Sequence, residues 1–125
     1  MIKKQDLRYS PEKQILVASI DIGTNSTHLL IAEINLELKS FSIKFTDKST
    51  TRLGERDEEG NLTEESIQRA LVTLKRFKEY CNSNEVKQIV TAATSAVREA
   101  PNGQDFIRRV LDAVSYTHLT LPTKA

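Results

Sequence analysis

The feature that most constrains the fold is a short apolar run that ends in an acidic residue and a glycine turn. Ile15–Ile22 reads ILVASIDI, and the turn GTNS follows before the chain becomes apolar again. A near-continuous apolar run of this length is typical of a strand in the middle of a sheet that is covered on both faces. The glycine that follows this run allows backbone amides to approach a ligand that a side chain would keep away.

Two more strands are predicted directly after the turn. Thr27–Leu36 is short and apolar, and Phe41–Phe45 alternates apolar with polar residues. Parallel neighbours need a crossover of a dozen or more residues, and these connections are too short for one. The first three strands should therefore form an antiparallel meander.

The second half of the chain predicts a helix, a strand and a second helix. Thr63 is a predicted N-cap, and the apolar residues from Ile67 to Cys81 recur at helical spacing. Lys87–Thr94 is predicted as a fourth strand, which the preceding helix leaves free to run parallel to the central strand. The segment SAVREAPNG is expected to be a turn or a short helix, and a second helix should begin near Gln104. The sequence therefore predicts an α/β fold.

Composition limits the chain to one modest domain. It has 125 residues, of which 38% are hydrophobic, and 18 basic residues nearly balance 17 acidic ones. The chain therefore lacks the excess of basic residues that is typical of a nucleic-acid-binding domain. Residues 1–12 are too polar for a signal peptide and no apolar run is long enough to span a bilayer, so a cytoplasmic protein is expected. Cys81 is the single cysteine and lies in a helical apolar pattern, which favours a packing role.

The turn after the first strand carries groups that suit phosphate. Gly23 permits close approach, and Thr24, Asn25 and Ser26 add hydroxyl and amide donors. Asp21 would repel a phosphate unless a cation such as Mg²⁺ or an attacking water lay between them, so it is a candidate Mg²⁺ ligand. The same residues also suit an ordinary hairpin in which Asp21 and Asn25 cap their own backbone. The residues alone leave both interpretations open.

The order of these segments resembles the start of a known phosphatase family. A strand, the DIGTNS turn, two strands, a TRLG loop, a helix, a strand and TAATSAVREAPNG are together similar to the exopolyphosphatase/guanosine-pentaphosphate phosphatase (Ppx/GppA) family. The resemblance covers Ile15 to about Ala113. It implies an incomplete actin-like or ribonuclease H-like domain, with a three-stranded antiparallel meander, a helix, a parallel fourth strand and a second helix. It divides the chain into a leader (1–14), a partial N-terminal phosphatase domain (15–113) and a non-native tail (114–125).

The same resemblance implies a set of phosphate-binding residues. Planar guanidinium groups suit phosphoanhydride oxygens because they donate in pairs and stay charged. Taken alone, Arg52 could be solvated in its charged loop, and Arg98 could pair with Glu99 or Asp105. The implied set consists of Asp21, Gly23, Thr24, Asn25, Ser26, Arg52 and Arg98.

The activity that the resemblance implies is release of terminal inorganic phosphate from polyphosphate, with Mg²⁺ as cofactor. Guanosine pentaphosphate is the alternative substrate, no nucleic acid or membrane partner is expected, and the full-length relative would be a homodimer. Members of the family place a general-base glutamate after the equivalent of the second helix. From Val114 this chain reads VSYTHLTLPTKA, which has no acid and resembles translated sequencing-adapter read-through. We therefore expect the polypeptide as written to lack the catalytic base and to be inactive.

Two other classes of function remain open from the sequence. One is an ATP-binding, kinase-like module of the wider actin-like superfamily, which uses the same aspartate-glycine turn. The other is a non-catalytic module that binds phosphate without cleaving it. Stabilisation by ATP without any effect of polyphosphate would favour the kinase-like module.

Overall fold

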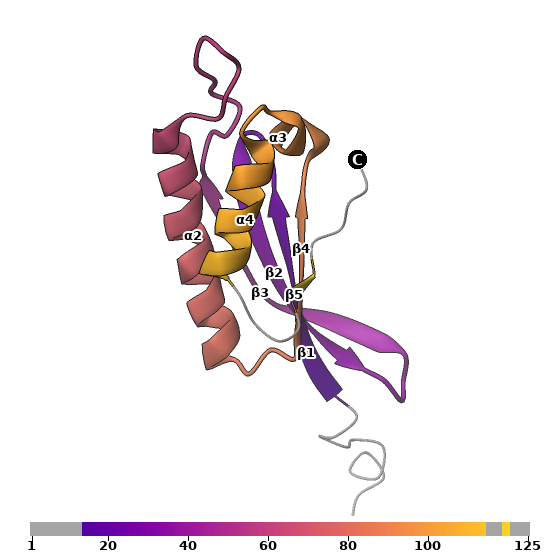
Figure 1. The fold of residues 1–125 in the computed structure, drawn as a ribbon. Helices are drawn as coiled ribbons and strands as arrows, with labels where there is room; N and C mark the ends of the chain where they lie inside the picture. Colours follow the sequence, from indigo (N-terminus) through magenta and orange to yellow (C-terminus); the bar gives the residue numbers. More distant parts are fainter. Residues whose placement is uncertain (1–13, 115–118, 121–125) are drawn as a thin grey trace, which may run out of the picture.

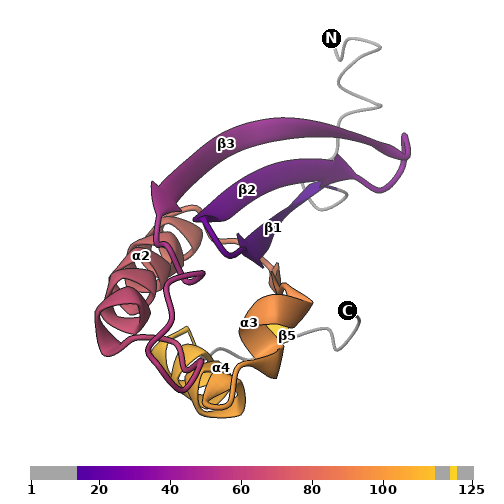
Figure 2. The same ribbon diagram turned by 90° about the horizontal axis from the view of Figure 1, so that it is seen from above.

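The computed structural model describes residues 14–114 and the backbone of residues 119–120. A five-stranded mixed sheet, in the order β3-β2-β1-β4-β5, carries its helices on one face (Figures 1 and 2). The strands are β1 (Gln14–Ile22), β2 (Ser26–Asn35), β3 (Ser40–Thr50), β4 (Gln88–Ala93) and β5 (Leu119–Thr120), and the helices are α2 (Glu64–Ser83), α3 (Ser95–Glu99) and α4 (Gly103–Ala113).

Strand directions in the sheet agree with the prediction from connection lengths. β1 lies in the middle, antiparallel to β2 and parallel to β4, and β2 is antiparallel to β3. The 20-residue helix α2 supplies the crossover that lets β4 run parallel to β1. The predicted α/β class, the meander and the parallel fourth strand are confirmed.

A fifth strand corrects the prediction of four. β5 pairs in parallel with β4, with Leu119 opposite Ile89 and Thr120 opposite Val90. It falls in the stretch that was predicted to be a non-native tail. The physical reason is that the edge of β4 presents backbone N–H and C=O groups, which an extended segment can satisfy whatever its side chains. Of the other residues in the predicted leader and tail, Gln14 begins β1 and Val114 is buried in the core at the end of α4, whereas residues 1–13, 115–118 and 121–125 lie outside the described residues.

The prediction that the first strand is covered on both faces is wrong. In β1 the side chains of Ala18, Ile20 and Ile22 are buried, whereas those of Ser19 and Asp21 are exposed. Viewed from above, the helices all lie on the same side of the strands (Figure 2). An apolar stretch in the sequence does not show whether both faces of its strand are covered. Here, alternate side chains point to a face that no described helix covers. We call this surface the open face.

A bulge prevents the apolar residues of β3 from sharing one face. The register between β2 and β3 shifts so that Ile31 pairs with Phe45 but Ala32 pairs with Ile43. Phe45 consequently lies on the helix side, where its ring centroid is 4.7 Å from that of Tyr80 in α2. Ile43 lies on the open face and is 57% exposed. The simple alternation in the sequence did not predict this division.

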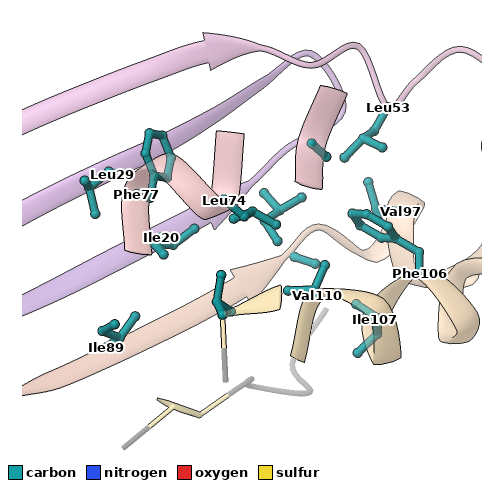
Figure 3. Packing of buried hydrophobic residues seen from close by; sticks show 14 of the residues in the cluster. Ile20, Leu29, Leu53, Leu74, Phe77, Ile89, Val97, Phe106, Ile107 and Val110 are labelled. Atoms are coloured by element: carbon teal, nitrogen blue, oxygen red, sulfur yellow. The ribbon is translucent and has the colours of Figure 1, made fainter. Parts of the chain in front are cut away.

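The core forms between the sheet and the helices. Thr63 caps α2 as predicted, since its Oγ1 accepts a hydrogen bond from the Ser66 N–H at 3.2 Å. Leu74, Phe77 and other residues of one α2 face are buried against β1, β2 and α4 (Figure 3). Cys81 belongs to this cluster, and burial raises the pKa of its thiol to about 11, which confirms the predicted packing role. Within the described ranges, no helix is long and apolar enough to cross a membrane.

Candidate functional site

The site is built on the tight turn between β1 and β2. The Gly23 N–H donates to the carbonyl oxygen of Ser26 at 3.0 Å and closes the hairpin. A Cβ at Gly23 would lie only 3.0 Å from that same oxygen, so a larger residue would push the turn apart. Among the described residues, no backbone carbonyl accepts from the N–H of Thr24 or Asn25, and both residues are exposed. The turn therefore leaves two amide donors available to a ligand.

Three backbone hydrogen bonds attach the loop after β3 to this turn. The N–H groups of Thr51 and Arg52 both donate to the carbonyl oxygen of Asn25 at 3.0 Å. The Gly54 N–H donates to the carbonyl oxygen of Thr24 at 2.7 Å. The turn and the loop therefore form one unit, and the distance in sequence between them is bridged by main-chain contacts.

Arg52 is held beside the turn in an unusual backbone conformation. Its φ is 51°, in the left-handed region that non-glycine residues seldom adopt. The next residue, Leu53, is fully buried at the end of the core that also contains Val97 (Figure 3). The Arg52 side chain is exposed, with Nε 3.5 Å from a carboxylate oxygen of Glu55. A hollow of about 370 Å³ is lined by Thr24, Asn25, Arg52, Gly54 and Glu55.

Two arginines that the sequence analysis missed support this loop. Arg69 of α2 donates from Nε to the Thr51 carbonyl oxygen at 3.0 Å, and its Nη2 lies 2.6 Å from Glu55. Arg56 donates from Nη2 to the carbonyl oxygen of Ala96 in α3 at 3.1 Å. These three contacts join residues 14 to 40 positions apart in the chain, so no local pattern could have indicated them.

Arg98 lies at the same end of the sheet but not in the hollow next to Arg52. The Thr94 N–H donates to the Ile22 carbonyl oxygen at 3.0 Å, which sets the start of α3 against the end of β1 (Figure 1). Arg98 Nε donates to the carbonyl oxygen of Ala93 at 3.1 Å, so its guanidinium is turned toward the carboxyl end of β4. The structure thus brings the turn residues and Arg52 together and places Arg98 on the adjacent element.

The residues that follow Arg98 have a structural explanation. The Asn102 side chain accepts from the Leu62 N–H at 2.8 Å and donates to the Leu62 carbonyl oxygen at 3.0 Å. A Cβ at Gly103 would lie 2.4 Å from the carbonyl oxygen of Arg98, so only glycine lets α4 begin this close to α3. The segment SAVREAPNG therefore fixes the place of α3, and with it that of Arg98.

Asp21 is the acidic group nearest to the turn in sequence. It is exposed at the end of β1, next to the buried Ile22. In the part of the chain that the structure describes, no three His, Cys, Asp or Glu residues gather closely enough to hold a metal ion by themselves. Mg²⁺ in phosphate sites is commonly held by one or two carboxylates together with water and the phosphates of the substrate. A single carboxylate is thus compatible with an ion shared with a phosphate ligand.

Comparison with known sequences gives matches over most of the chain. A sequence profile of the Ppx/GppA phosphatase family matches residues 30–118. The bifunctional 3-dehydroquinate synthase/phosphatase of Fusobacterium nucleatum is 39% identical over 107 residues, which cover 81% of this chain and 16% of that protein. Exopolyphosphatase 1 of Mycobacterium tuberculosis is 32% identical over 92 residues, which cover 73% of this chain and 26% of that protein.

Solved structures give a consistent result. The crystal structure of a Ppx/GppA family member from Aquifex aeolicus has a TM-score of 0.77 at 33% identity, covering 87% of this chain and 36% of that one. An exopolyphosphatase from Cytophaga hutchinsonii has a TM-score of 0.73 at 34% identity, covering 85% of this chain and 33% of that one. The chain spans about a quarter of the curated exopolyphosphatase and about a third of each solved chain.

Proposed function

Because the chain belongs to the Ppx/GppA phosphatase family, we propose that it forms a phosphate-binding part of an exopolyphosphatase-type hydrolase. The observation that carries this proposal is the pair of available N–H groups on Thr24 and Asn25 beside the exposed side chain of Arg52. Backbone amides and guanidinium groups are both well suited to bind phosphate oxygens. The substrate class is then a phosphoanhydride chain whose terminal group occupies the turn.

Polyphosphate is the substrate that we propose first. Support comes from relatives named exopolyphosphatases, one of them similar over 85% of this chain in structure. Guanosine pentaphosphate ends in the same phosphoanhydride chemistry, and the donors at the turn would contact only its phosphates. It is therefore the alternative substrate in the test below. The cytoplasmic location and the homodimer remain predictions.

The reaction adds water across the terminal phosphoanhydride bond, so one orthophosphate leaves and the chain becomes one phosphate shorter. Arg52 and Arg98 would neutralise negative charge on the bound phosphates, and the turn amides would orient the terminal group. Mg²⁺, where bound, would withdraw charge from the phosphate oxygens, with Asp21 as its protein ligand. The proton of the attacking water needs a base, which we predict lies outside this chain.

Binding of long-chain polyphosphate, measured by isothermal titration calorimetry in Mg²⁺ buffer, tests the proposal. Arg52→Ala should weaken binding by about tenfold, the size expected from losing one charge-assisted contact of about 1.5 kcal/mol. Arg108→Ala is the matched control, because Arg108 is a 70% exposed arginine of α4 whose ion pair is with Asp105. Absence of binding by the parent chain, or equal affinities for the two variants, would contradict the proposed site.

Other ligands and the turnover measurement separate the remaining alternatives. Stronger thermal stabilisation by guanosine pentaphosphate than by polyphosphate would favour the alternative substrate. Stabilisation by ATP alone would favour a kinase-like module. Phosphate release should not exceed that of Asp21→Ala, and Mg²⁺-dependent turnover above this control would overturn the prediction that the chain lacks its base.

A further inference from the structure

A row of polar residues crosses the open face next to the turn. Asp21 is paired with His28 across β1 and β2, and His28 is paired with Lys48 across β2 and β3. Residues directly opposite each other in antiparallel strands point to the same face, with Cβ atoms about 5 Å apart. The adjacent residues Ile20 and Leu29 are buried on the helix side, so the row lies on the open face.

The row continues into a second hollow, distinct from the one at Arg52. Its volume is about 480 Å³, and both His28 and Lys48 line it. The acidic residue of its lining, Asp47, is already engaged: Oδ2 accepts from Arg76 Nε at 3.0 Å, and Oδ1 accepts from the Lys48 N–H at 2.8 Å. The charge of Asp47 is thereby balanced from the helix side, which leaves an imidazole and an ammonium group facing the hollow.

These two basic groups are not used elsewhere in the described part of the chain. Neither the His28 nor the Lys48 side chain makes a hydrogen bond or an ion pair there, whereas Lys44 on the same strand lies 3.6 Å from Glu33. Many exposed lysines are simply solvated. Lys48 differs from such residues in its position on the sheet. Two residues further along β3, Thr50 pairs with Ser26 of the turn, so Lys48 lies close to the turn.

We propose that His28 and Lys48 form a second phosphate subsite, which holds inner phosphate groups of a polyphosphate chain whose terminal group lies at the turn. Neighbouring strands are about 4.8 Å apart, so Lys48 lies about 10 Å from β1 across the sheet. Only a chain of several phosphates can reach both places. The subsite would thus favour long chains over orthophosphate, and it rests on the proposed function.

The test compares Lys48→Met with Lys75→Met in the full chain, with titrations of long-chain polyphosphate and of orthophosphate at low salt. Lys75 is an exposed lysine of α2, so its substitution removes the same charge from the opposite side of the sheet. Lys48→Met should bind long-chain polyphosphate about twofold to fivefold more weakly than Lys75→Met, in line with an exposed ionic contact of up to about 1 kcal/mol. His28→Gln should weaken it in the same direction, and orthophosphate binding should stay unchanged in all variants.

Two results would overturn the subsite. One is equal affinity of Lys48→Met and Lys75→Met for long-chain polyphosphate while Arg52→Ala still binds weakly, which rejects the subsite and leaves the proposed function intact. The other is the absence of chemical-shift changes at the backbone amides of His28 and Lys48 when polyphosphate is added. No binding by the parent chain would instead reject the proposed function, and the subsite with it.

Discussion

The carbonyl oxygen of Asn25 accepts two hydrogen bonds, from the backbone N–H groups of Thr51 and Arg52, each at 3.0 Å. This double contact draws the chain after β3 back over the turn and forces Arg52 into a left-handed conformation with φ of 51°. A non-glycine residue held there costs about 1–3 kcal/mol. Main-chain hydrogen bonds, and not contacts of the Arg52 side chain, therefore place this arginine next to the amides of the turn.

Arg52→Gly should therefore separate backbone strain from phosphate binding. Glycine adopts the left-handed conformation without strain but loses more entropy on folding, so the free energy of unfolding should stay within about 1 kcal/mol of the parent. Polyphosphate affinity should fall about tenfold, as for Arg52→Ala, because both lack the guanidinium. Urea denaturation and calorimetry measure the two effects. Retained affinity in the glycine variant would show that the side chain does not contact the ligand.

Gly103→Ala should destabilise the contact between α3 and α4. The new Cβ would lie 2.4 Å from the Arg98 carbonyl oxygen. The backbone fixes the position of the Cβ, and the oxygen belongs to the main chain, so neither atom can rotate away. Overpacking of this kind should lower the free energy of unfolding, measured by urea denaturation, by about 1–3 kcal/mol.

Gly54→Ala provides the comparison, because its Cβ would be 3.4 Å from the Thr24 carbonyl oxygen, at the edge of ordinary contact. It should change the free energy of unfolding less than Gly103→Ala does. Equal stability of the two variants would mean that α4 can move away from α3 at little cost.

Two buried threonines should respond oppositely to replacement by valine. The Thr91 hydroxyl is buried without a hydrogen-bond partner among the described residues, so Thr91→Val should leave stability unchanged or raise it by about 1 kcal/mol. The Thr27 hydroxyl lies 2.9 Å from that of Thr51 in a buried pair. Thr27→Val leaves Thr51 unpaired and should cost about 1–3 kcal/mol. Thermal melts of both variants measure the two changes in stability. A larger loss of stability for Thr91→Val than for Thr27→Val would show that the Thr91 hydroxyl does have a hydrogen-bond partner.

Stability should depend on pH through Glu64. Arg109 donates to both of its carboxylate oxygens, at 3.1 and 2.9 Å, and Gln68 donates at 2.8 Å. The hydrogen bonds from Arg109, and then that from Gln68, lower the pKa of Glu64 from 4.5 to about 2. A carboxylate with a lowered pKa stabilises the fold above the unfolded value, so its contribution is present above pH 4.5 and disappears as the pH falls toward 2.

Glu64→Gln should therefore lower the melting temperature at pH 7 and have little effect near pH 2. The Glu64 side chain is 64% exposed, so solvent screens the pair and the loss should be only about 0.2–1 kcal/mol. Glu65→Gln is the control, because it removes an exposed acid from the same first turn of α2. If the two variants showed the same pH profile, the helix dipole rather than Arg109 would account for the effect.

Sequence patterns predicted those elements whose cause is local. The cap at Thr63, the helical spacing from Ile67 to Cys81 and the apolar run of the first strand each reflect interactions between residues close together in the chain. Short connections were enough to predict the antiparallel meander. The turn residues were also predicted as a group, because glycine and small polar residues between two strands allow few other conformations.

The long-range features were not predictable in the same way. The bulge between Ile31 and Ala32, which divides the apolar residues of β3 between two faces, is set by the register of two strands. The contacts of Asn102 with Leu62 and of Arg56 with Ala96 each join residues 40 positions apart. No spacing rule reaches across such a separation.

The sequence by itself therefore determined the first four strands, the helices and the glycine turn between the first two strands, because local sterics and periodicity control them. Only the tertiary structure decided which face of the sheet stays open, that Arg52 lies against the turn, and that His28 and Lys48 fall in line with Asp21. The physical reason is that register and loop docking depend on backbone hydrogen bonds between distant segments, and every residue carries nearly the same backbone groups.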